Sequence, residues 1–156
     1  MCPFWGTKLV AVGALLFVIG FELITCFFRF GLGKTSTGST GFIGKLTGGV
    51  RIHHGYVGLL LILTRNLFPI FTLPFIGNWQ HLAAIIGWGC VLSDLIHHFW
   101  VLYPIAGKHD FDLVYPRNSF PWLAELEAKW RTSPVFASIG IFATFVLCFL
   151  FLVISR

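Results

Sequence analysis

Charged side chains are scarce in this sequence. Asp, Glu, Lys and Arg together make up 11% of its 156 residues, whereas soluble domains carry about a quarter. The shortage excludes an ordinary soluble domain and leaves lipid as the solvent for most of the surface. The length allows about four membrane spans with their loops, so we expect a single membrane domain over residues 1–156.

Cysteine and acidic residues are also few. The four cysteines lack the short paired spacing of a zinc or redox motif, and three of them lie in apolar runs, which is typical of small packing residues. Six acidic residues face eleven basic ones, and the net charge is +5. Because the basic residues flank apolar segments, we attribute them to membrane topology and contact with the lipid bilayer, and we expect no nucleic acid partner.

Hydrophobic residues are abundant instead, at 56% of the chain with 18 Phe and 6 Trp, and the mean hydropathy is +0.84. This composition predicts an all-α, polytopic integral membrane protein with four transmembrane helices and a short interfacial amphipathic helix. The spans are expected at about residues 9–28, 51–66, 79–103 and 135–154, and the interfacial helix at about 120–131. The segment 51–66 is short for a span.

Basic residues predict the orientation of these spans. One face would carry three of them, Lys8, Arg65 and Arg156, and the other would carry eight, namely Arg29, Lys34, Lys45, Arg51, Lys108, Arg117, Lys129 and Arg131. Cytoplasmic loops carry the excess of Lys and Arg. We therefore expect the eight-residue face to be cytoplasmic and both termini to lie on the other side.

Six ionisable side chains are expected near that cytoplasmic face at similar depth, because consecutive spans are antiparallel: Glu22, His53, His54, Asp94, His97 and His98. On a helix, residues three and four apart share a face, so Asp94, His97 and His98 fall on one arc of about 100°. An Asp at the membrane centre costs about 2.5–3.5 kcal/mol, and a cation bound by the whole group would offset such costs. These residues therefore predict a transition metal site for iron, copper, zinc or manganese. Because adjacent side chains on a helix point about 100° apart, one or both histidines of each pair would join Asp94 as ligands, with Glu22 as an additional ligand or proton carrier.

The segment Asp94-Leu95-Ile96-His97-His98 resembles the His-x-x-His-His box of membrane fatty-acid desaturases and hydroxylases, with Asp in place of the first His. The resemblance covers these five residues, and those enzymes gather histidines from several boxes around a di-iron centre. It implies a metal at the cytoplasmic membrane edge and no particular reaction.

Three functions stay open at this stage, and the residues do not decide whether the protein is an enzyme. The first is a metal site for redox or hydrolytic chemistry on a lipid-soluble substrate, with Glu22 as a ligand or proton carrier. The second is a non-catalytic small subunit of a larger membrane complex, whose histidines would either hold haem or chlorophyll or simply hydrogen-bond to neighbouring groups. The third is a proton-coupled transporter.

Overall fold

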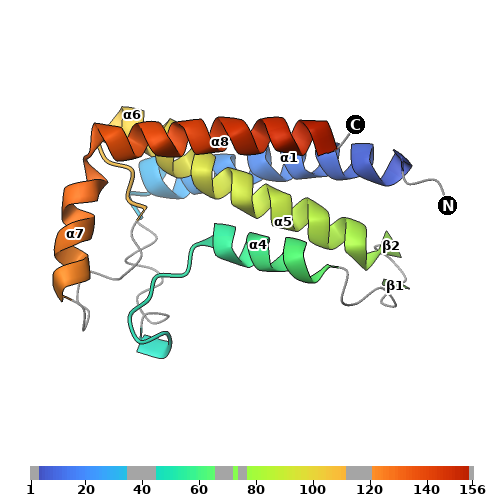
Figure 1. Ribbon diagram of the computed structural model, residues 1–156, viewed down its shortest axis with the longest axis horizontal. Coiled ribbons are helices and arrows are strands. Elements are labelled where there is room, and N and C mark those ends of the chain that lie inside the picture. Colours follow the sequence, from blue (N-terminus) through green and yellow to red (C-terminus); the bar gives the residue numbers. More distant parts are fainter. Residues whose placement is uncertain (1–3, 35–44, 66–71, 74–76, 112–120, 155–156) are drawn as a thin grey trace.

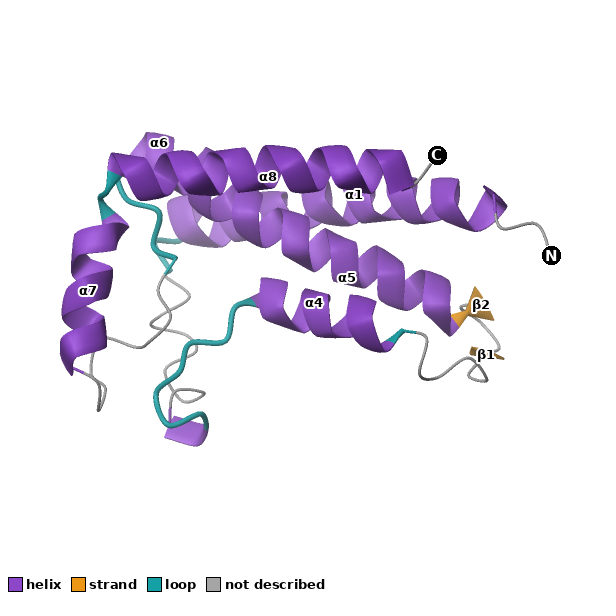
Figure 2. Ribbon diagram, in the orientation of Figure 1, coloured by secondary structure: helices purple, strands orange, loops and turns teal. Residues whose placement is uncertain are grey.

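The computed structural model describes residues 4–34, 45–65, 72–73, 77–111 and 121–154. These residues are almost entirely helical, which confirms the all-α class (Figure 2). Among the described residues, two short β-strands, β1 (Thr72–Leu73) and β2 (Gly77–Asn78), pair antiparallel.

Three helical segments are long and apolar enough to cross a membrane, and they coincide with three of the four predicted spans. The first is α1 (Phe4–Cys26), which continues into the π-helical turn η1 (Phe27–Gly31). The second is α5 (Trp79–Leu95), continued by the π-helix η2 (Ile96–Leu102) and by α6 (Tyr103–Ala106). The third is α8 (Pro134–Ile154). By length and composition, these helices indicate a membrane protein.

The span predicted at 51–66 is not confirmed. Its helix, α4 (His54–Thr64), has 11 residues and is therefore about 16 Å long, about half of the hydrocarbon thickness of a bilayer. The residue before it, His53, is extended, with φ −80° and ψ 146°. The helix therefore begins one residue after His53, inside the pair of histidines.

Helix α5 is the centre of the fold, with α1, α4 and α8 packed on it (Figure 1). Glycines allow the closest approaches. A Cβ atom on Gly58 of α4 would lie 2.5 Å from the carbonyl oxygen of Gly87 on α5, and a Cβ on Gly89 would lie 2.5 Å from the ring of Phe17 on α1. Small residues let neighbouring helices approach closely without a penalty from side chains. These contacts set the depth at which side chains of α1, α4 and α5 meet.

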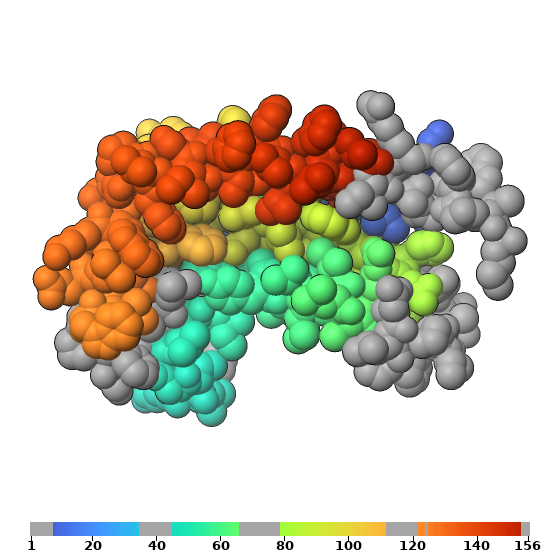
Figure 3. Space-filling model, viewed as in Figure 1, coloured from blue at the N-terminus to red at the C-terminus, as the bar shows by residue number. Residues whose placement is uncertain are grey.

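The distribution of apolar and polar side chains is the reverse of that in a soluble domain. Phe142 and Phe145 on α8 are 69% and 64% exposed, while Asp94 and His98 are buried. In the space-filling view, α8 covers the upper part of the visible face and α4 the lower part (Figure 3). An apolar exterior around buried ionisable groups is typical of a protein surrounded by lipid.

The amphipathic helix predicted at about 120–131 is present as α7 (Pro121–Arg131), which lies across one end of the bundle (Figure 1). The expected pair between Glu125 and Lys129 forms, with Oε1 and Nζ 3.4 Å apart. Trp122 is exposed, whereas Trp130 stacks on Phe136 of α8 with ring centroids 5.4 Å apart. The location of α7 at a membrane surface stays a prediction.

Candidate metal centre

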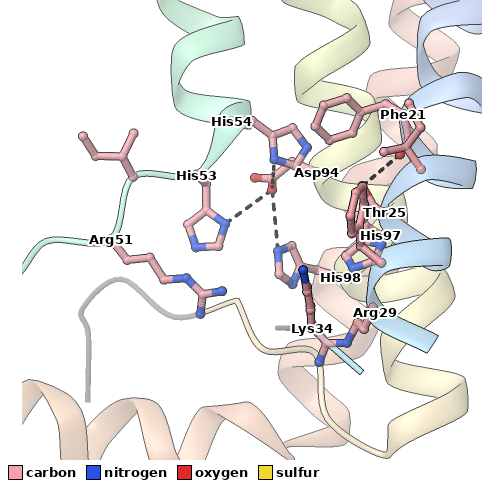
Figure 4. A pocket seen from close by; sticks show the side chains of 13 residues that line it. Phe21, Thr25, Arg29, Lys34, Arg51, His53, His54, Asp94, His97 and His98 are labelled. Carbon is pink, nitrogen blue, oxygen red and sulfur yellow. Dashed lines mark hydrogen bonds and ion pairs between the residues drawn. The ribbon is translucent and has the colours of Figure 1, made fainter. Parts of the chain in front are cut away.

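The carboxylate of Asp94 on α5 is the centre of the site. It is 2% exposed, and three imidazoles from two different segments converge on its Oδ1 atom (Figure 4). The three distances to Oδ1 are 3.3 Å from His53 Nδ1, 3.3 Å from His54 Nδ1 and 3.6 Å from His98 Nε2.

Local structure explains this convergence. Asp94 and His98 are four residues apart, which places both on the side of the helix that faces α4. Opposite Asp94, helix α4 has Gly55, where a Cβ atom would lie only 2.7 Å from Asp94 Oδ2. The missing side chain therefore lets the carboxylate lie against α4. His53 precedes that helix in an extended conformation, and its ring also reaches Asp94.

The hydrogen bond at His98 determines where its proton lies. Its Nδ1 atom donates to the carbonyl oxygen of His109, so a neutral His98 has a lone pair on Nε2. That lone pair faces Asp94 Oδ1, and two acceptors in this arrangement repel each other unless a proton or a metal ion lies between them. Histidines that bind metals commonly donate their other N–H to a backbone carbonyl in this way.

The carbonyl of His109 reaches the site because of a turn after α6. Gly107 ends this helix in the left-handed conformation, with φ 67°, as glycine does at many helix ends. The ring of His109 has its own partners: its Nε2 donates to the carbonyl oxygen of Trp130 at 2.8 Å, and its Nδ1 accepts from the backbone N–H of Phe111 at 3.1 Å. His109 therefore orients His98 through its backbone oxygen, while its ring joins the turn to α7.

Phe111 forms an apolar wall beside the histidines. Its ring stacks on His53 with centroids 4.5 Å apart and planes 23° apart, and it meets His98 edge to face at 5.2 Å and 87°. These contacts restrict the rotation of both imidazoles. A site held this way is preorganised by packing as well as by hydrogen bonds.

The distances fit both hydrogen bonding and metal ligation, and His53 Nδ1 and Asp94 Oδ1 form a long hydrogen bond of 3.3 Å. Charge-assisted N–H···O⁻ bonds are about 2.7–2.9 Å long, shorter than the 3.3 Å of His53 or the 3.6 Å of His98. In a tetrahedral site with metal–ligand bonds of about 2.0–2.2 Å, neighbouring ligand atoms lie roughly 3.3–3.6 Å apart. His53, Asp94 and His98 are all buried and each offers a ligand atom within 4.8 Å of the others. The three residues thus lie close enough together to hold one ion.

The other predicted residues form a second group on the α1 side. Glu22, Cys26 and His97 offer ligand atoms within 4.8 Å of one another. His97 Nδ1 donates to Glu22 Oε2 at 2.9 Å, and Ser93 Oγ donates to Glu22 Oε1 at 2.9 Å. His54 Nε2 lies 3.3 Å from the same Ser93 oxygen, so Ser93 connects the two groups.

The six predicted residues are therefore divided between two groups. His97 contacts Glu22 of α1, whereas His98 contacts His53 and His109, which lie outside the helices; adjacent side chains on a helix point about 100° apart. Two further residues, Ser93 and Cys26, were missed by the sequence reasoning. The spacing of Cys26, one helical turn after Glu22, is the signal that indicates it.

The site opens into a cavity of about 490 Å³ (Figure 4). On the α1 side it is lined by Phe21, Ile24, Thr25 and Phe28, and Asp94 with its neighbouring histidines lines another part. Basic residues line the remaining part, namely Arg29, Lys34 and Arg51. The cavity therefore joins an apolar wall, a basic rim and a group of potential metal ligands.

Asp110 holds part of the basic rim in place. It forms an ion pair with Arg29, and its backbone oxygen accepts a hydrogen bond from Arg51 Nη1 at 3.3 Å. Burial by itself raises the pKa of Asp110, but the hydrogen bond from Arg29 and the charges of Lys108, Arg29 and Arg131 outweigh it and hold the pKa below its usual value. Asp110 is thus a carboxylate that stays ionised and anchors several cations.

Comparison of the chain with protein-family models, curated proteins and solved structures found no match. The interpretation of the site therefore rests on its geometry. That geometry supports one coarse statement, that a buried group of His and Asp side chains is able to hold a metal ion.

Proposed function

We propose that this protein is a membrane metalloprotein that binds one transition metal ion through His53, Asp94 and His98 and acts on a lipid-soluble substrate. The observation that carries the proposal is the position of His98: its Nδ1–H is committed to a carbonyl, and its Nε2 faces a buried carboxylate 3.6 Å away. A bound ion turns this repulsive arrangement into an attractive one.

Three protein ligands leave a coordination position for water or substrate. Two His and one carboxylate are the ligand set of several catalytic zinc sites and of non-haem iron oxygenases. When bound, such an ion supplies Lewis acidity or lowers the pKa of a bound water, and iron or copper adds redox chemistry. We favour a bare ion over haem or chlorophyll because the Asp94 carboxylate occupies the space between His53 and His98 where a macrocycle would lie.

The second group of residues suits proton transfer to this centre. Ser93 links Glu22 to His54, whose Nδ1 is 3.3 Å from Asp94 Oδ1. Chains of ionisable side chains serve as proton relays in membrane pumps and transporters. Glu22 is thus assigned as a proton carrier and His54 as the link to the metal centre.

The orientation in the membrane is part of the proposal. Helices α1 and α5 both end at the site, since Glu22 near the end of α1 contacts Ser93 and His97 of the second long segment. The chain must therefore return to the opposite end between them, and we propose that α4, which begins at the site, belongs to this return path. The basic residues at the site end assign it to the cytoplasmic face, with both termini on the other side.

Metal analysis of the purified protein tests the proposal. Wild type, Asp94→Asn and His81→Ala are expressed with iron, zinc, copper and manganese supplied, purified in a neutral detergent and measured by mass spectrometry of the elements. We expect one ion per chain in wild type and His81→Ala, and a loss of at least about tenfold in Asp94→Asn. Asn costs no more than Asp in the membrane, so insertion should persist.

His81 is the matched control, because it lies at the start of α5 while Asp94 lies near its end. Wild-type protein without any of the four metals would refute the metal centre. Equal metal loss in the two variants would show that the ion is bound elsewhere.

A further inference from the structure

The cavity beside the metal centre has an apolar wall that continues to the outside of the protein. Ile24 and Phe28 line the cavity, yet they are 57% and 45% exposed. They belong to the segment Lys8–Gly31, which is long and apolar enough to cross a membrane. A hydrocarbon chain in contact with this surface therefore has a continuous apolar path from the bilayer into the cavity.

Basic side chains line another part of the cavity, which we call the basic rim. Among the described residues that line the cavity, Arg29, Lys34 and Arg51 are basic, and Asp94 is acidic. Asp110 pairs with Arg29, but Lys108 Nζ and Arg131 Nε lie 3.8 and 3.9 Å from the same carboxylate. The cavity lining itself therefore carries three basic side chains and one carboxylate.

We propose that the cavity binds an anionic lipid, with its phosphate or carboxylate headgroup between the basic rim and the metal centre. The first part of its acyl chain lies against Ile24 and Phe28. Guanidinium groups match the paired oxygens of such headgroups, and about 490 Å³ falls within the roughly 300–1,000 Å³ of small-molecule sites. That this lipid is a substrate rests on the metal-dependent function proposed above; that it binds rests on the cavity alone.

The binding of three probes separates the contribution of the basic rim from that of the apolar wall. Purified protein in an uncharged detergent is titrated with dodecyl phosphate, dodecanol and inorganic phosphate, and complexes are counted by native mass spectrometry. Dodecyl phosphate uses both the rim and the apolar wall, so it should bind more tightly than either other probe. If dodecanol bound as tightly as dodecyl phosphate, the basic rim would contribute nothing to binding. If inorganic phosphate bound as tightly, the apolar wall would contribute nothing. Either result would overturn the proposal.

A pair of lysine variants supplies the matched control. Lys34 and Lys45 are both exposed, so neither substitution threatens the fold, and Lys34 lines the cavity whereas Lys45 does not. One basic residue near a membrane surface contributes about fivefold to the binding of an anionic lipid. Lys34→Gln should therefore weaken dodecyl phosphate binding about fivefold, and Lys45→Gln should leave it unchanged. Equal weakening in both variants would indicate general charge attraction and refute the site.

Metal content is measured on the same samples. Protein that holds its metal but shows no preference for dodecyl phosphate refutes the lipid ligand and leaves the metal centre intact. Preference for dodecyl phosphate in protein that holds no metal refutes the metal centre and supports the lipid site.

Discussion

Substitution of Gly55 tests the metal centre without changing any ligand. A Cβ atom at Gly55 would lie 2.7 Å from Asp94 Oδ2, 3.1 Å from its Cβ and 3.2 Å from its Cγ. Carbon atoms in contact prefer about 3.5–4.0 Å, so in Gly55→Ala the Asp94 side chain must move by roughly half an ångström. Metal–ligand distances tolerate about 0.2 Å. The carboxylate would therefore leave its ligand position while His53 and His98 stay unchanged.

The expected loss can be compared with known effects on metal sites. Loss of the groups that support a ligand lowers metal affinity about 10- to 100-fold, which corresponds to about 1.4–2.8 kcal/mol. We expect a loss of this size in Gly55→Ala, measured by competition with a chelator of known affinity in detergent. Circular dichroism on the same samples reports whether the helices persist.

Gly20→Ala is the matched control, because a Cβ atom at Gly20 of α1 would meet nothing within 4 Å. It should keep the metal affinity of wild type. Gly55→Ala protein that is folded and binds metal with undiminished affinity would refute the reasoning, since the ion would then not depend on Asp94 in this position.

Two further predictions concern Glu22 and Asp110. Glu22→Gln should keep the metal, because Glu22 contacts His97 and Ser93 instead of the Asp94 carboxylate; metal loss comparable to Asp94→Asn in elemental analysis would show that the two groups form one site. Since the folded-state pKa of Asp110 is below its usual value, which is about 3.9, its stabilising contribution is complete above about pH 4 and is lost as the pH falls through the folded-state pKa. Asp110→Asn should therefore lower the melting temperature at pH 7 and reduce its decline on acidification, and an unchanged pH dependence of melting would contradict the assigned ion pairs.

Local features of the chain determined much of what could be predicted. Hydropathy over about 20 residues decides whether a segment can lie in lipid, because a helix satisfies its own backbone hydrogen bonds there. The segments 9–28, 79–103 and 135–154 therefore coincide with long helices. The pairing of Asp94 with His98 also follows from helical spacing alone.

Where a helix stops was harder to predict. The predicted segment 51–66 contains a helix of only 11 residues, although its apolar run suggested a longer one. His53 is extended rather than helical, and in that conformation its ring reaches Asp94. Capping and tertiary contacts decide such boundaries, and hydropathy carries little information about them.

The division of the six ionisable residues into two groups depended entirely on tertiary structure. Helical geometry places His97 and His98 about 100° apart, but it does not say which neighbour each one meets. That choice follows from the close approach of α4 at Gly58 and of α1 at Gly89, which puts different helices on the two sides of α5. The carbonyl of His109, which holds the proton of His98, arrives through a turn outside the helix. The sequence by itself determined that ionisable groups lie near one end of a membrane bundle, because composition and periodicity are properties of each segment. Only the tertiary structure decided which of them lie close enough together to hold one ion, because ligand distances depend on how closely separate helices pack.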